Sequence, residues 1–311
     1  MGCFWLLITI YIFTILIIII DSKASCTNTL APLIRALWRT SDTLTKLYLT
    51  HFDNCCKIYI SDILTYSTNL QTLLMNALCP LDEIIGEVKC LKKSYNTLVD
   101  VELTTSLTTG PSLRPLLQCC PKIRRLCLGN CTSDVMDVDE LYNDNLEIFG
   151  YNSGYGIPSL AEKDAEFYDG PPGLREIYAT DTPDVPDNGL MRLLKKNQKS
   201  LQTVHASMST TKEQPERGEP YTDFKPTYEK CYFERLQNFS YRCSHYSLIE
   251  TVLLKSIELF APSLKNFAAA NSPNVLLMVD TLIKLPSLEE ISLSSIRYLG
   301  DRSYLLSSAL V

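Results

Sequence analysis

The residues best suited to chemistry are cysteines gathered in one stretch of the chain. This stretch contains Cys119, Cys120, Cys127 and Cys131. Four thiolates satisfy the tetrahedral coordination of zinc, but standard zinc sites space their cysteines as Cys-x-x-Cys pairs, and these residues do not. We therefore favour a structural role for them, and we expect neither a metal nor another cofactor.

Other residue types give little indication of catalysis. The histidines, His51, His205 and His245, are far apart, and none has a plausible nucleophile beside it in the sequence. Catalytic triads assemble from distant positions, so this spacing only lowers the expectation. No Walker loop, Gly-x-Gly-x-x-Gly or His-Glu-x-x-His motif is present. We expect a protein that is not an enzyme and has no catalytic residues.

Composition limits the classes of partner. Hydrophobic residues make up 46% of the 311, which is enough for a substantial core. The net charge is -6, whereas binding to nucleic-acid phosphates needs clustered Lys and Arg, so we do not expect a nucleic-acid partner. The 12 cysteines are dispersed, unlike the dense disulfide frameworks of short secreted chains. A reduced, intracellular body is the simpler interpretation.

Residues 1–24 form a hydrophobic segment with the character of a membrane-contacting element. No charge occurs from Met1 to Ile20, and this length would cross a hydrocarbon core as a helix. The small residues Ser22 and Ala24 favour a cleaved signal peptide, although the usual positively charged start is missing. With such a signal, the rest of the chain would be secreted.

A membrane anchor over residues 4–20 is the competing interpretation. No Lys or Arg precedes it, whereas Lys23, Arg35 and Arg39 follow it. The positive-inside rule then places the body of the chain in the cytosol. We expect a cytosolic protein anchored by this segment, with secretion as the alternative; a misassigned gene start, which would make the segment an artefact, is the third interpretation.

A repeat runs through the rest of the chain. Its frame is an apolar residue, two variable residues, an apolar residue, one variable residue, and a final apolar or small residue. Copies begin at Leu44, Leu70, Leu98, Ile123, Leu146, Leu174, Leu201, Leu264 and Leu288. Successive starts lie 23 to 28 residues apart, except for 63 residues between Leu201 and Leu264. This period is typical of leucine-rich repeats.

The repeat predicts an α/β leucine-rich-repeat solenoid over residues 44–311, preceded by an N-terminal flank at 25–43. Alternation along each short strand points the fourth and sixth frame residues inward and their neighbours outward. Stacked strands then form a curved parallel sheet on the concave side. Helices with apolar residues at helical spacing would cover the convex side, at Leu81–Tyr95, Ser159–Asp169, Asn188–Ser200 and Ser247–Ala261.

The long interval contains a stretch at 208–243 that is rich in charge and contains proline. We expect an inserted loop there, because the segment is too polar to bury a face. It is either a contact element or a tolerated surface insertion. Two residues, Asn130 and Asn238, match the N-glycosylation acceptor pattern. Asn238 lies in the predicted loop, where it would be accessible.

Outward strand positions on the concave side are the predicted binding surface for a protein partner. They combine aromatic side chains with charges of both signs, as interface hot spots do. The candidate residues are Lys46, Tyr48, Glu102, Arg125, Asn152, Glu176, Tyr178 and His205. The alternative is a sheet face that is merely solvated.

Residues 116–131 carry a family resemblance. The stretch Leu-Leu-Gln-Cys-Cys-Pro-Lys-Ile-Arg-Arg-Leu-Cys-Leu-Gly-Asn-Cys resembles the repeat of F-box-type leucine-rich-repeat proteins, where a helix ends in Cys-Pro and a Cys closes the turn after the strand. The resemblance implies a ubiquitination substrate on the concave face. We find no F-box before Leu44, so a cullin-ligase adaptor is expected only if that module lies outside this sequence. The alternative is a secreted or membrane-displayed leucine-rich-repeat receptor or adhesion module.

Overall fold

The structure is a computed structural model of the chain. It describes residues 15–19, 30–52, 59–86, 94–142, 144–152, 157, 160, 170–179, 187–208, 230–243 and 248–295. The chain divides into two compact units, Met1–Tyr168 and Asp169–Val311. Each unit is a parallel sheet with helical connections, so the chain is an α/β protein.

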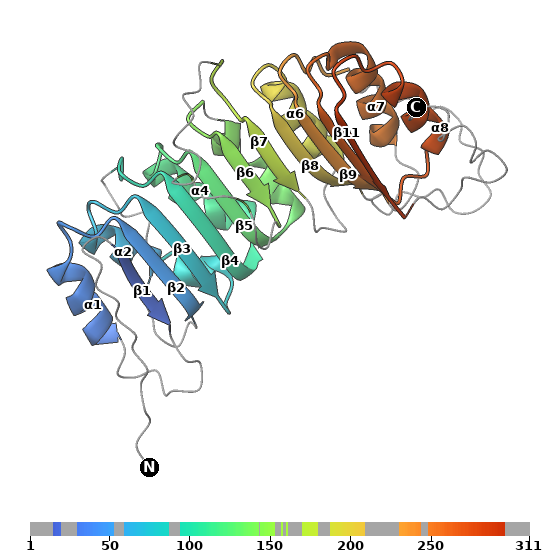
Figure 1. The fold of residues 1–311 in the computed structure, drawn as a ribbon. Helices are drawn as coiled ribbons and strands as arrows, with labels where there is room; N and C mark the ends of the chain where they lie inside the picture. Colours follow the sequence, from blue (N-terminus) through green and yellow to red (C-terminus); the bar gives the residue numbers. More distant parts are fainter. Residues whose placement is uncertain are drawn as a thin grey trace, which may run out of the picture. The chain divides into compact units, whose positions relative to one another are not determined.

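The first unit consists of parallel strands that lie side by side in chain order (Figure 1). Its strands are β1 (Ile15–Ile19), β2 (Lys46–Phe52), β3 (Thr72–Ala77), β4 (Asp100–Thr108), β5 (Arg125–Cys131) and β6 (Ile148–Tyr151). Its helices are α1 (Leu30–Arg39), α2 (Ile60–Tyr66), α3 (Leu81–Ile84) and α4 (Gly110–Cys119), and 3-10 turns follow at Ser133–Asp137 and Asp139–Tyr142.

The second unit repeats this plan. Its parallel strands are β7 (Glu176–Ala179), β8 (Thr203–Met208), β9 (Asn238–Cys243), β10 (Asn266–Ala270) and β11 (Glu290–Ser294), again in chain order. The helices are α6 (Asp187–Asn197), α7 (Leu248–Phe260) and α8 (Val275–Leu282). Strand directions and chain order agree with the parallel sheet predicted from the repeat.

The repeat frame predicted the register of the strands. Leu73 pairs with Leu47 and Val101, the equivalent residues of the neighbouring copies, and all three are buried. In the second unit, Ile177 likewise pairs with Val204. Each such side chain contributes about 1.5 to 3 kcal/mol when it leaves water. Because a slip of one residue would expose this whole row, burial fixes the register.

Local sequence signals set where helix α4 begins and ends. Thr109 caps its start, with its hydroxyl accepting the Ser112 N–H at 3.2 Å, and the Ser112 hydroxyl accepts the Thr109 N–H in return. Pro111 suits the first turn, because a proline there sacrifices no helical hydrogen bond. After the helix, Cys120 and Pro121 lead the chain into β5.

The predicted loop at 208–243 was wrong in its last part. Asn238–Cys243 is β9, and Phe239 lies between Val204 of β8 and Phe267 of β10 in the buried row. Leu236-Gln-Asn-Phe-Ser-Tyr241 fits the repeat frame, but aromatic residues stand where leucines were sought and a charged stretch precedes them. Residues 209–229 of the predicted loop lie outside the described part of the chain.

Two of the predicted helices are confirmed, as α6 and α7. The helix predicted over Leu81–Tyr95 is shorter, because α3 ends at Ile84 and residues 87–93 are not described. Of the helix predicted over Ser159–Asp169, the structure describes Leu160 alone.

The hydrophobic N-terminus differs from expectation where it is described. Ile15–Ile19 is a strand rather than part of a helix, and Leu16 and Ile18 pair with Leu47 and Leu49 of β2. Its β-branched isoleucines favour an extended backbone over a helix. Across the described residues, none of the helices has both the length and the apolar character needed to span a membrane. The rest of the predicted anchor lies outside the described residues.

The described cysteines are free thiols. Burial raises the pKa of Cys120 to about 12, with the adjacent Cys119 adding to the effect. Burial also raises the pKa of Cys131 to about 12, although a hydrogen bond from the backbone of Asn152 lowers it. Within the described ranges, no cluster of His, Cys, Asp or Glu is arranged to hold a metal ion.

Candidate functional site

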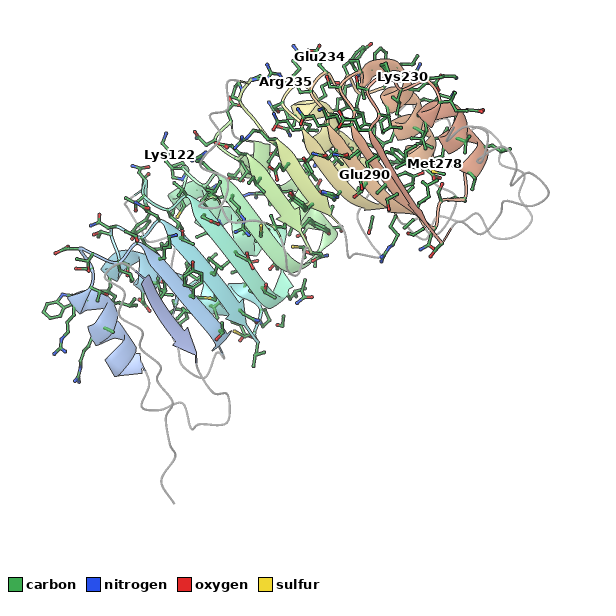
Figure 2. All side chains as sticks on the ribbon, viewed as in Figure 1. Lys122, Lys230, Glu234, Arg235, Met278 and Glu290 are labelled. Carbon is green, nitrogen blue, oxygen red and sulfur yellow. The ribbon has the colours of Figure 1, made fainter. Side chains whose placement is uncertain are left out.

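The candidate site is the side of each sheet that faces away from the helices, which we call the outer face. It is formed by strand residues that alternate with the buried core residues. Two residues labelled in Figure 2 contrast the two environments in the second unit: Met278 of α8 is buried in the core, whereas Glu290 of β11 is exposed on the outer face.

On the outer face of the first unit, a buried ion-pair cluster joins β4 and β5. Arg125 donates from one terminal nitrogen to Asp100 Oδ1 at 2.7 Å and from the other to Glu102 Oε2 at 2.7 Å. The side chains of Arg125 and Asp100 are 2% and 3% exposed, and that of Glu102 is 25% exposed. Arg125 was predicted to face a partner. Its side chain points to the outer face as predicted, but its charge is already paired with Asp100 and Glu102.

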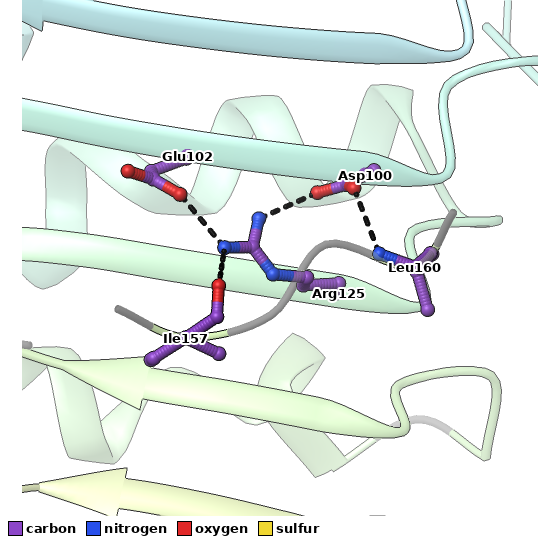
Figure 3. Close-up of polar contacts among 5 residues, drawn as sticks. All are labelled: Asp100, Glu102, Arg125, Ile157 and Leu160. Atoms are coloured by element: carbon purple, nitrogen blue, oxygen red, sulfur yellow. Dashed lines mark hydrogen bonds and ion pairs between the residues drawn. The ribbon is translucent and has the colours of Figure 1, made fainter. Parts of the chain in front are cut away.

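Ile157 and Leu160, from a later part of the same unit, contact this cluster (Figure 3). Arg125 also donates to the carbonyl oxygen of Ile157 at 3.0 Å, and Asp100 Oδ2 accepts the backbone N–H of Leu160 at 3.3 Å. Leu160 is 4% exposed. The frame gave no signal for this contact, because it arises between residues that are 32 to 60 positions apart and belong to different repeats.

The electrostatics of the cluster favour a permanently charged guanidinium. Burial opposes its charge, but neighbouring Cys127 and Asp100 and the hydrogen bonds to Glu102 and Asp100 outweigh this, and together they raise the pKa of Arg125. Among the described residues, Arg125 Nε is buried without a hydrogen-bond partner. A buried donor left unsatisfied costs about 1 to 3 kcal/mol.

The other predicted residues of the first unit have different roles. Lys46 and Tyr48 lie on the outer face of β2, partly exposed as predicted. Asn152 follows β6 with φ of 52°, the left-handed conformation that asparagine tolerates, and its side-chain oxygen accepts the N–H of Cys131. Asn152 therefore stabilises the turn that follows β6, and its predicted place in a binding surface stays a prediction.

In the second unit, the predicted residues Glu176, Tyr178 and His205 form one group. Tyr178 and His205, which pair across β7 and β8, stack with ring centroids 5.0 Å apart. The Tyr178 hydroxyl donates to Glu176 Oε2 at 2.7 Å, and His205 Nδ1 hydrogen-bonds to the hydroxyl of Ser240 on β9. All four side chains are partly exposed.

A row of side-chain hydrogen bonds crosses the same face and was missed by sequence reasoning. Asn266 Nδ2 donates to Asn238 Oδ1 at 2.6 Å, and Asn238 Nδ2 donates to Thr203 Oγ1 at 3.1 Å. The three residues share one position of the repeat frame, which is the signal that would have found them once β9 was recognised. Asn238 is therefore a member of the sheet instead of an accessible loop residue.

These two groups together form what we call the outer strip. It consists of Glu176, Tyr178, Thr203, His205, Asn238, Ser240 and Asn266. Its side chains are partly exposed, and they are held in place by stacking and by hydrogen bonds to one another. This arrangement offers a flat aromatic pair beside amide donors and acceptors, which is suited to non-covalent binding.

On the opposite side of the second unit, a buried carboxylate fixes the helices. Glu250 is 0% exposed and accepts hydrogen bonds from the Tyr241 hydroxyl at 3.0 Å, the Ser272 hydroxyl at 2.5 Å and Asn274 Nδ2 at 2.6 Å. Burial raises the pKa of Glu250 although all three donors lower it. This network ties α7 to β9 and to the start of α8.

No protein-family model matches the sequence, and a search of curated proteins finds no match. The functional assignment therefore depends on the geometry of the outer face.

Proposed function

We propose that the chain is a non-catalytic recognition scaffold of the leucine-rich-repeat type, which binds a protein partner through the outer strip of its second unit. The observation that carries the proposal is the stacked Tyr178–His205 pair held between Glu176 and Ser240. Aromatic side chains are the commonest energetic anchors of protein interfaces. Because these are already fixed by neighbours, little side-chain entropy is lost when a partner binds.

The repeat supports the same proposal at the level of the fold. Its period of 23 to 28 residues and its register agree with a leucine-rich-repeat solenoid. The resemblance of residues 116–131 to F-box-type proteins leads us to propose a ubiquitination substrate as the partner. Recovery of a cullin-ligase adaptor with the purified chain would support that narrower assignment, and its consistent absence would remove it.

The experiment is a comparison of three chains as bait for quantitative crosslinking in cells of the source organism. We expect the double variant Tyr178→Ala, His205→Ala to lose at least tenfold in recovery of the partner bound by the unaltered chain, because a hot-spot residue contributes about 2 kcal/mol or more. Tyr232→Ala is the matched control, since Tyr232 is an exposed aromatic residue, 52% exposed, outside the outer strip.

Equal recovery with the double variant and the unaltered chain would contradict the proposal. A comparable loss with Tyr232→Ala would also contradict it, because binding would then not be specific to the outer strip.

A further inference from the structure

Two main-chain groups from a later part of the chain lie against the outer face of the first unit. Ile157 presents its carbonyl oxygen to Arg125, and Leu160 presents its N–H to Asp100, so the ion pair lies between two main-chain groups three residues apart (Figure 3). Leu160 itself is buried, at 4% exposure. The sheet thus contacts a carbonyl and an N–H three residues further on.

We propose that Asp100, Glu102 and Arg125 form a peptide-binding clamp, which Ile157 and Leu160 occupy in the isolated chain and which main-chain groups of a protein partner occupy in their place. This inference rests on the proposed function and specifies a second contact for the same partner. The clamp recognises backbone groups, so its ligand is defined by main-chain geometry.

The charges of the clamp favour an uncharged ligand. Two carboxylates surround one guanidinium, and the Arg125–Asp100 pair is almost fully buried. An anionic group such as a phosphate would meet Asp100 and Glu102 at close range, where like charges repel. Peptide groups are dipoles, which can accept from Arg125 and donate to Asp100 without adding a net charge.

Ile157 and Leu160 leave one donor of the clamp unsatisfied. Arg125 Nε is buried and has no acceptor among the described residues. Since an unsatisfied buried donor costs about 1 to 3 kcal/mol, a ligand that supplies a further acceptor binds more strongly than the resident groups. The resident groups have the advantage of being tethered, which gives them an effective concentration in the millimolar range.

The test uses a synthetic peptide with the sequence of residues 153–164 and the full chain in three forms. In one variant, residues 153–164 are replaced by Gly and Ser; in a milder variant, Leu160→Gly weakens the resident contact. Isothermal titration should show the peptide binding the replaced variant at least tenfold more tightly than the unaltered chain, with Leu160→Gly in between. The milder variant keeps the test informative if the full replacement does not fold.

Two controls show whether the clamp itself is responsible. A peptide with N-methylleucine at position 160 keeps the side chain but lacks the N–H that Asp100 accepts, so it should bind at least tenfold more weakly. In the replaced chain, Arg125→Lys removes the planar fork but keeps the charge and should cost a similar factor. Arg124→Lys is the matched control, because Arg124 pairs with Glu147 at the surface and should leave binding unchanged.

The inference is overturned if the peptide binds neither variant, or if binding ignores both the N-methyl group and Arg125→Lys. Such a failure leaves the proposed function intact, since partner recovery through Tyr178 and His205 is measured separately. Conversely, the peptide could bind the clamp while the outer strip captures no partner. That result would support the clamp and contradict the proposed function.

Discussion

At the scale of single residues, a side chain that points to the outer face is not necessarily free to bind a partner. Arg124 directly precedes β5, and Arg125 is its first residue. Arg124 forms a surface ion pair with Glu147, whereas Arg125 is almost fully buried in its ion pair with Asp100. A buried pair that loses one partner leaves an uncompensated charge, whereas a surface pair exchanges its partner for water. Adjacent arginines therefore differ strongly in their effect on stability.

We expect Arg125→Ala to lower the free energy of unfolding by about 3 to 5 kcal/mol, because Asp100 would remain buried without its partner. Arg124→Ala should lower it by less than about 1 kcal/mol. Urea unfolding followed by circular dichroism compares the two. Equal losses would show that the Arg125 cluster is open to solvent, against its observed burial.

Glu250 should make stability decrease with rising pH. Its pKa is raised in the folded state, so the folded chain holds this proton more tightly than the unfolded chain does. Stability from this group is complete below the unfolded pKa, about 4.3, and is lost as pH rises through the folded pKa. Glu250→Gln should remove that decrease, seen as urea midpoints that fall less between pH 4 and pH 7.

Glu258 provides a control of opposite sign. Hydrogen bonds from Lys284 and Lys255 lower its pKa, so its contribution is present above the unfolded pKa and is lost as pH falls. Glu258→Gln should therefore reduce stability at neutral pH more than at pH 4. If both variants shifted the urea midpoints in parallel at all pH values, neither carboxyl would be responsible for the pH dependence.

At the scale of elements, the turn that leads into β7 depends on one glycine. Gly173 has φ of 113°, and a Cβ there would lie 2.8 Å from Asn197 Oδ1. The same oxygen accepts the N–H of Leu174 at 3.0 Å and so joins the end of α6 to the start of β7. Backbone strain and crowding both oppose any side chain at this position.

Gly173→Ala should lower the free energy of unfolding by about 1 to 3 kcal/mol, measured by urea unfolding. Gly129→Ala is the graded comparison. Its Cβ would approach the Thr104 side chain at 3.0 Å, but its backbone is not in the left-handed region, so we expect a smaller loss. A larger loss for Gly129→Ala would show that packing outweighs backbone conformation here.

The elements that the sequence predicted well are those whose inward residues are aliphatic. Leu73 and Val101 identified their strands because alternation and period agreed. β9 was not predicted, because Phe239 and Tyr241 stand in place of leucines after a charged stretch. β1 was not predicted either, because an uncharged apolar run is compatible with both a helix and a strand. Position in the repeat predicted the direction of Arg125, but it could not predict that Ile157 and Leu160 return over it.

At the scale of the whole molecule, thiol reactivity should report folding. Burial raises the pKa of Cys120 to about 12 and that of Cys231 to about 11, so both are protonated and enclosed at pH 8. Cys119 is less buried and its pKa is raised as well. Iodoacetamide should therefore modify Cys119 first and reach the other two only as the chain unfolds, as peptide mass spectrometry of timed samples would show.

Adding urea below the unfolding midpoint should accelerate modification of Cys120 and Cys231 together with the loss of helical signal. If Cys120 reacted as fast as Cys119 in the absence of urea, the end of α4 would be open in the native chain.

The strands of the second unit pair with their chain neighbours, β10 between β9 and β11. Under mechanical load applied through the C-terminal end, a sheet whose strands pair in chain order should unfold one repeat at a time. From Asn266 to Glu290 a step would release 24 residues, and from Asn238 to Asn266 it would release 28. Extended chain spans at most about 3.3 to 3.6 Å per residue, so optical tweezers should record increments of roughly 80 to 100 Å. A single rupture of the whole unit would indicate cooperativity beyond adjacent repeats.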